Sequence, residues 1–136
     1  MTPEQRFDIV LYRINSAKAL LTEIDDHIKR GYYNTAMNRM YYACFYAVSA
    51  LLLHAEVDGV KSHEGVRQMF GKHFIQTGLL PREWGHFYTI IFNNRSAADY
   101  EDFKTYDLKA TQELFPRICT FIELIDKQIF QKANTR

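Results

Sequence analysis

The sequence has few of the residues that interrupt helices and little net charge of either sign. Only three prolines and six glycines occur among 136 residues, and most of them fall between segments with a helical spacing of apolar residues. This scarcity of turn residues argues against a β fold with many short strands. The formal net charge is +1, with basic and acidic residues mixed along the chain, which argues against an extended basic surface for nucleic acid.

Other features are absent as well. No run of about 18 apolar residues is free of charge, so we expect no transmembrane helix. The first residues, MTPEQRFDIV, lack the basic and apolar regions of a secretory signal, and we expect a cytoplasmic protein. Cys44 and Cys119 fall at apolar helical positions and are expected to be core residues. No Cys/His spacing is typical of a zinc site, and the sequence predicts no metal and no cofactor.

Helical periodicity is what the sequence has in abundance. Thr2, Pro3 and Gln5 form the pattern of a capping box, and apolar residues then recur every three or four positions to about Gly31. A second helix is predicted over about 33–55, with one stripe of larger apolar residues and one of alanines. Because a single bundle need not cover both stripes, this pattern, together with Arg95, predicts a homodimer. Further helices are predicted over about 62–78, with Ser62 as the capping residue, from Pro81 onward and over about 107–131. We therefore expect an all-α, up-and-down bundle of about five helices in a single domain, residues 1–136.

Arg95 is the polar residue that departs most from this pattern. It shares one helical face with Trp84, Tyr88 and Ile91, and Asp99 follows four residues later. One interpretation is a structural Arg95–Asp99 ion pair at the helix end. That order of charges is the less favourable one, and an aspartate near the C-terminal end opposes the helix dipole. The other interpretation is that Arg95 lines a functional cleft, and the sequence leaves both open.

Two further stretches carry polar groups among apolar neighbours. In MNRMYYACFYA, Asn38 and Tyr42 are separated by one helical turn and Arg39 is adjacent. In KSHEG, Lys61 and His63 stand at a predicted helix start, where backbone N–H groups favour anions. Both have structural interpretations: core tyrosines whose hydroxyls reach the surface, and an ordinary helix cap with exposed charges. All five residues are candidate ligand-binding residues.

Three stretches together resemble a known family: MNRMYYACFYAVSALLL, KSHEGVRQMFGKHFIQTGLLP and RSAADYEDF. They are similar to the HEPN domain, most of all to its stand-alone, uncharacterised bacterial and archaeal branch, over about residues 5–130. The resemblance implies an up-and-down helical bundle that dimerises. It also implies a minimal nucleotidyltransferase as partner, in what is discussed as a toxin–antitoxin pair. Ribonuclease members of the family carry an arginine followed a few residues later by a histidine.

The family's arginine matches Arg95, whereas its histidine has no match because no histidine follows His86. Asp99 and Tyr100 stand where the histidine would be. Arginine suits charge stabilisation on a phosphate, and histidine suits deprotonation of a 2′-hydroxyl. Asp99 beside an arginine would be a weak base, since the cation lowers the pKa of a carboxyl group.

Three hypotheses follow from the resemblance. The leading one is a dimeric HEPN protein that binds a nucleotide, RNA or a nucleotidyltransferase partner through a cleft containing Arg95, Asp99 and Tyr100. The second is a metal-independent ribonuclease toxin with an altered set of residues, for which His63 would have to approach the arginine in space. The third is an interaction protein whose polar residues fix dimer register without a ligand. The sequence leaves open whether the protein is an enzyme.

Overall fold

Five α-helices and one π-helical turn make up the part of the chain that the computed structural model describes, residues 1–100 and 105–131. Side chains are described for residues 1–95 and 105–131. The elements are α1 (Pro3–Lys29), α2 (Tyr33–His54), α3 (His63–Phe70), the π turn η1 (Gly71–Ile75), α4 (Arg82–Tyr100) and α5 (Leu108–Phe130). No strand occurs in these residues, and the expected all-α bundle is confirmed.

Helix α1 begins and ends as its sequence predicts. The backbone N–H of Gln5 donates to Thr2 Oγ1 at 3.1 Å, and the Thr2 N–H donates to Gln5 Oε1 at 2.9 Å, so both halves of the capping box form. Gly31 follows the helix with a φ of +82°, a left-handed conformation that glycine adopts without strain. The next helix can therefore return alongside the first.

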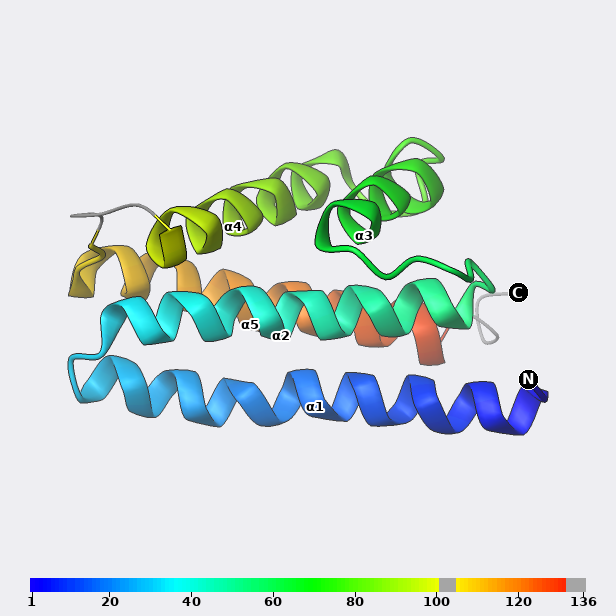
Figure 1. Cartoon of the computed structure of the whole chain (residues 1–136), viewed down its shortest axis with the longest axis horizontal. Helices are drawn as coiled ribbons and strands as arrows, with labels where there is room; N and C mark the ends of the chain where they lie inside the picture. Colours follow the sequence, from blue (N-terminus) through cyan, green and yellow to red (C-terminus); the bar gives the residue numbers. More distant parts are fainter. Residues whose placement is uncertain (101–104, 132–136) are drawn as a thin grey trace.

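Helix α2 is the central element of the bundle. Figure 1 shows α1 running beside it on one side, α3 and α4 on the other, and α5 behind it, and α2 contacts all four helices. Both of its apolar stripes are buried within the one chain. The small stripe comprises Ala36, Ala43, Ala47 and Ala50, and the larger one Met37, Tyr41, Cys44, Val48, Leu51 and Leu52.

This burial corrects one inference from the sequence. Two apolar stripes on one helix suggested that a second copy of the chain covers one of them. Other helices of the same chain cover both stripes, so that reason for a homodimer is wrong. The homodimer itself stays a prediction from the family resemblance.

The segment between α3 and α4 departs from a regular α-helix. The N–H of Gln76 donates to the carbonyl oxygen of Gly71 at 2.8 Å, five residues back, which is the hydrogen bond of a π-helix. Phe70, just before this turn, and Phe74, within it, are both buried. Ile75 then packs closely on α4, where a Cβ atom at Gly85 would lie 2.9 Å from Ile75 Cγ1. Apolar spacing predicts one continuous helix here and does not reveal the wider turn.

Helix α5 closes the core from the far side of α2. Asp107 caps it by accepting a hydrogen bond from the Ala110 N–H at 2.9 Å. Phe121 is fully buried among aromatic rings of α3 and α4. Cys44 is buried as expected, but Cys119 is only half-buried, because its position lies at the margin of the α5 apolar face. Within the described residues, no helix has the length and apolar character needed to cross a membrane.

Candidate functional site

Arg95 lies on the inner face of α4, as its spacing predicts. Tyr88 and Ile91 on the same face are fully buried, and Arg95 is 8% exposed. Its guanidinium carbon lies 4.8 Å from the centroid of the Tyr41 ring on α2. An arginine over an aromatic face is attracted by the ring's quadrupole, which offsets part of the cost of removing its charge from water. The buried arginine is thus seated on a tyrosine of the central helix.

His63 reaches the same tyrosine from α3. Its Nδ1 atom is 2.7 Å from the Tyr41 hydroxyl oxygen, a hydrogen-bond distance. Its ring lies 4.6 Å from the Phe45 ring and 5.8 Å from the Tyr42 ring, measured between centroids. We name these five residues, Tyr41, Tyr42, Phe45, His63 and Arg95, the Tyr41 cluster. The structure thus brings a histidine from a distant part of the sequence to the arginine's aromatic partner.

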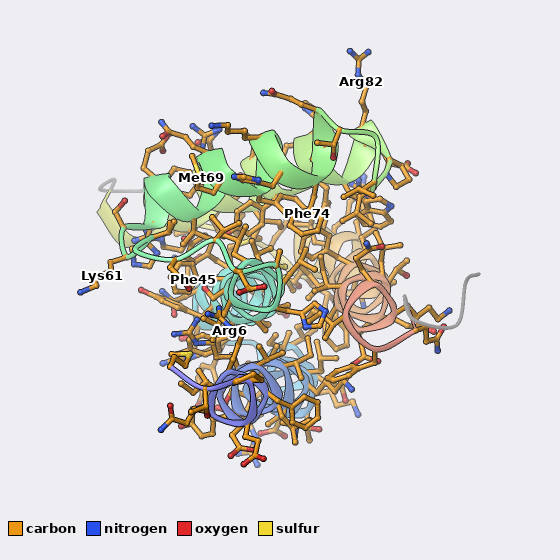
Figure 2. All side chains as sticks on the ribbon, turned by 90° about the vertical axis from the view of Figure 1, so that its right-hand side faces the viewer. Arg6, Phe45, Lys61, Met69, Phe74 and Arg82 are labelled. Carbon is orange, nitrogen blue, oxygen red and sulfur yellow. The ribbon has the colours of Figure 1, made fainter. Side chains whose placement is uncertain are left out.

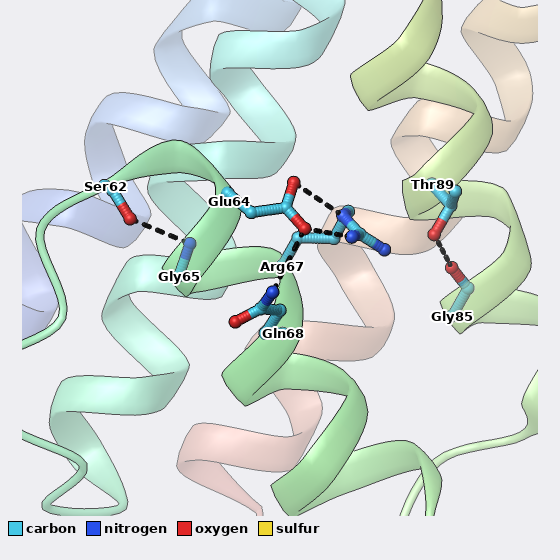
Figure 3. Close-up of polar contacts among 7 residues, drawn as sticks. All are labelled: Ser62, Glu64, Gly65, Arg67, Gln68, Gly85 and Thr89. Carbon is cyan, nitrogen blue, oxygen red and sulfur yellow. Dashed lines mark hydrogen bonds and ion pairs between the residues drawn. The ribbon is translucent and has the colours of Figure 1, made fainter.

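The local sequence explains how α3 presents His63. Ser62 caps the helix by accepting a hydrogen bond from the Gly65 N–H at 2.9 Å (Figure 3). A Cβ atom at Gly65 would lie only 2.7 Å from Ser62 Oγ, so a glycine suits this close approach. The cap makes His63 the first residue of α3 and fixes the direction of its side chain. The interpretation of KSHEG as an ordinary cap is therefore correct for Ser62.

A second arginine, Arg67, lies beside the cluster and was not identified from the sequence. Its guanidinium carbon is 5.4 Å from the Phe92 ring, which in turn packs edgewise on Tyr41 at 6.0 Å. Figure 3 shows Arg67 paired with Glu64, whose carboxylate also accepts a hydrogen bond from Gln68. The Glu64 carboxylate therefore offsets the charge of Arg67.

Tyr106, just before α5, forms two hydrogen bonds close to Arg95. Its backbone N–H donates to Asn34 Oδ1 at 2.8 Å, and its hydroxyl donates to the Asn94 carbonyl oxygen at 3.1 Å. These bonds join the first turn of α2 to the residue that precedes Arg95. These two hydrogen bonds were not predicted from the sequence, since the partners of Tyr106 are 72 and 12 positions away.

Burial shifts the proton affinities of both hydrogen-bonded groups. Burial raises the pKa of Tyr41 to about 12, although the nearby charge of Arg95 opposes the shift. Burial, and then the Arg95 charge, lower the pKa of His63 from its ordinary value of 6.5. At neutral pH the site therefore holds a phenol, a neutral imidazole and a guanidinium cation. A neutral imidazole can accept a proton at Nε2 when Nδ1–H donates to the Tyr41 oxygen.

The predicted residues divide into three groups in space. Arg95, His63 and Tyr42 come together in the Tyr41 cluster. Asn38 and Arg39 are half-buried at the turn of α2 that precedes it, and Lys61 is exposed in the loop before α3. The side chains of Asp99 and Tyr100 lie outside the described residues, so the Arg95–Asp99 pair stays a prediction.

The helical fold is that of a recognised class of small proteins. The model of the HEPN domain matches residues 10–128, and the chain therefore belongs to the HEPN domain family. A UPF0332 protein of Thermotoga maritima is 32% identical over 121 residues, which cover 89% of this chain and 91% of that protein. The resemblance seen in the sequence, to the HEPN domain and its uncharacterised branch, is confirmed.

Two relatives from Methanocaldococcus jannaschii bear the name "Putative toxin". One is 38% identical over 88 residues, which cover 65% of this chain and 59% of that protein. The other is 35% identical over 83 residues, which cover 61% of both chains. The chain therefore spans about three fifths of the length of these two proteins.

Proposed function

We propose that the protein is a HEPN toxin that acts as a homodimer and binds phosphate groups of RNA or of a nucleotide at the Tyr41 cluster. The observation that carries the proposal is the convergence of Arg95 and His63 on Tyr41. The names of the two Methanocaldococcus relatives support the toxin part of it. A minimal nucleotidyltransferase is the partner that the family resemblance implies.

The chemistry of the cluster suits an anion. The guanidinium stays charged at every physiological pH and donates hydrogen bonds in a planar fork that matches phosphate oxygens. Arg95 is 8% exposed and His63 is half-buried, so a phosphate that entered here would meet His63 first. The aromatic walls exclude part of the surrounding water, which strengthens the attraction between the cation and a phosphate.

His63 favours a second candidate function, metal-independent cleavage of RNA. In that reaction Nε2 of His63 takes the proton of a 2′-hydroxyl, and the 2′-oxygen attacks the adjacent phosphorus. The bond from phosphorus to the 5′-oxygen breaks, and the 5′-oxygen takes a proton from water. Arg95 would stabilise the charge that develops on the phosphate oxygens. A histidine with a lowered pKa is in its neutral, proton-accepting form at pH 7.

Binding and cleavage can be tested with one set of variants. We expect Arg95→Met to remain folded and lose RNA binding, whereas His63→Asn should retain measurable binding and lose any cleavage seen in the presence of a chelator. Arg117→Met is the matched control, because Arg117 also lies over an aromatic ring, Phe87 at 4.5 Å, but on the exposed side of α5. Equal binding by wild type and folded Arg95→Met would overturn the proposal and favour a purely structural arginine. Cleavage that survives in His63→Asn would reject the histidine as base.

A further inference from the structure

A groove runs between α1 and α2, next to the loop that leads into α3. It has a volume of about 580 Å³ and is lined by Tyr12, Arg13, Phe45, Tyr46, Val60 and Lys61, among others. Sites for small ligands in proteins have volumes of roughly 300–1,000 Å³. The groove is therefore large enough to hold a compact ligand. The residues that line it indicate the chemical class of that ligand.

The charge of the groove is positive. It contains Arg13 and Lys61, and no aspartate or glutamate is among its lining residues. In the described part of the chain, neither cation lies within ion-pair distance of a carboxylate. The other basic residues of α1 are neutralised: Arg6 pairs with Asp58, Lys18 with Asp126 and Lys29 with Asp25. Arg13 instead donates one hydrogen bond, to the Ser49 carbonyl oxygen at 3.4 Å. Its charge remains available to an anion.

The groove also offers aromatic surface. Tyr12 is 75% exposed at its rim, whereas Val10 and Ile14, two positions away on either side, are buried. Tyr46 and Phe45 are half-buried in the opposite wall. Nucleobases stack on aromatic side chains of this kind, and neighbouring cations hold the phosphates. Positive charge and exposed rings together are the chemistry of a single-stranded nucleic acid site.

The groove adjoins the Tyr41 cluster through one shared residue. Phe45 lines the groove and also packs against the His63 ring at 4.6 Å. Lys61 lies in the loop that leads into α3 and precedes His63 by two positions. Figure 2 shows Phe45 and Lys61 on the same side of α2, the side away from α5. A strand whose phosphate contacts His63 can therefore continue into the groove.

From these observations we infer that the groove between α1 and α2 is a subsite for a nucleotide of single-stranded RNA that flanks the phosphate at the Tyr41 cluster. The base stacks on Tyr12, and the backbone phosphate lies between Arg13 and Lys61. The inference rests on the proposed function and narrows its ligand, because the bases of a duplex are stacked on one another and cannot enter such a groove.

The test is a binding titration with a labelled single-stranded RNA of about eight nucleotides, at several salt concentrations. We expect Tyr12→Ala to weaken binding by about tenfold, and Tyr12→Phe to bind like wild type because it keeps the ring. Arg13→Gln and Lys61→Gln should each lower the slope of log affinity against log salt by about one. Arg30→Gln is the matched control, since Arg30 lies just after α1 and is paired with Asp26. Thermal melting of every variant verifies that it is folded.

The outcomes separate this inference from the proposed function. If folded groove variants bind RNA like wild type while Arg95→Met does not, the groove is no subsite and the proposed function stands. If the groove variants lose binding and Arg95→Met does not, the groove is the binding site and the role of Arg95 is rejected. Equal affinity for single-stranded and double-stranded RNA, or no RNA binding by wild type, would overturn the inference.

Discussion

His63 Nδ1 and the Tyr41 hydroxyl oxygen lie 2.7 Å apart, and the two residues are 22 positions apart in the sequence. The hydrogen bond joins the first residue of α3 to the middle of α2. Arg95 of α4 lies over the same tyrosine. Tyr41 of the central helix therefore orients one side chain from α3 and one from α4.

Tyr41→Phe removes the hydroxyl and keeps the ring beneath Arg95. We expect a loss of about 1 kcal/mol in the free energy of unfolding, because one partly buried hydrogen bond disappears. The side-chain ¹⁵N resonances of His63 should also move, since its Nδ1 loses its partner. Tyr42→Phe is the control, because the Tyr42 ring packs edgewise on His63. Chemical denaturation and NMR check the prediction, and unchanged His63 resonances in Tyr41→Phe would contradict it.

The pKa of His63 predicts how stability depends on pH. In the folded protein this pKa is lowered from 6.5 by burial and by Arg95, so the unfolded chain takes up the proton first as pH falls. The contribution of His63 to stability is therefore lost as pH drops below about 6.5 towards the folded-state pKa. We expect His63→Asn to lose less stability than wild type between about pH 7 and pH 5. His86→Asn, at an exposed position of α4, is the control. Parallel pH profiles for wild type and His63→Asn would argue against the shift.

A substitution at Ala47 tests whether the small residues of α2 are required for close helix packing. It is fully buried, and α2 contacts four other helices. We expect Ala47→Leu to cost about 1–3 kcal/mol in stability, because added methylene groups must displace neighbouring side chains. Ala55→Leu, at the exposed position just after α2, should change stability by less than about 0.5 kcal/mol. Thermal and chemical unfolding provide the comparison, and equal stability of the two variants would show that the bundle has unfilled space at Ala47.

The homodimer is tested by sedimentation at micromolar concentration. The family resemblance predicts a species of about twice the monomer mass of 16.1 kDa. Dilution should not release monomer until the concentration falls below the dissociation constant. A species at the monomer mass over the whole range would reject the dimer, without affecting the contacts of the Tyr41 cluster within one chain.

Helical periodicity predicts much of this fold because most helices pack one apolar face on α2. The capping residues Thr2 and Ser62 are correctly identified from sequence, as is the inner position of Arg95. Each of these depends on neighbours within one or two helical turns. The spacing rules therefore contain the information that is needed.

The partners of Arg95 and His63 depend on tertiary packing and are harder to predict from the sequence. Helical spacing predicts that Arg95 is on the buried face of α4. It does not predict that the guanidinium lies over the Tyr41 ring, because that contact depends on the angle between α2 and α4. The same holds for His63, which approaches only because the loop before α3 folds back along α2. No local sequence pattern predicts the hydrogen bond from the Tyr106 N–H to Asn34 Oδ1. Contacts between distant segments are where sequence reasoning is weakest here.

The π turn at Gly71–Ile75 has a consequence for length variation among relatives. A π turn holds one residue more than an α-helical turn, so a chain with one residue fewer at this point can continue as a regular α-helix. Both flanking segments keep their places in that case. A single-residue deletion in the middle of α2, by contrast, rotates every later side chain by about 100° and turns its core face outward. We therefore expect single-residue gaps between Phe70 and Gln76 in alignments of related proteins, and none within the central helix.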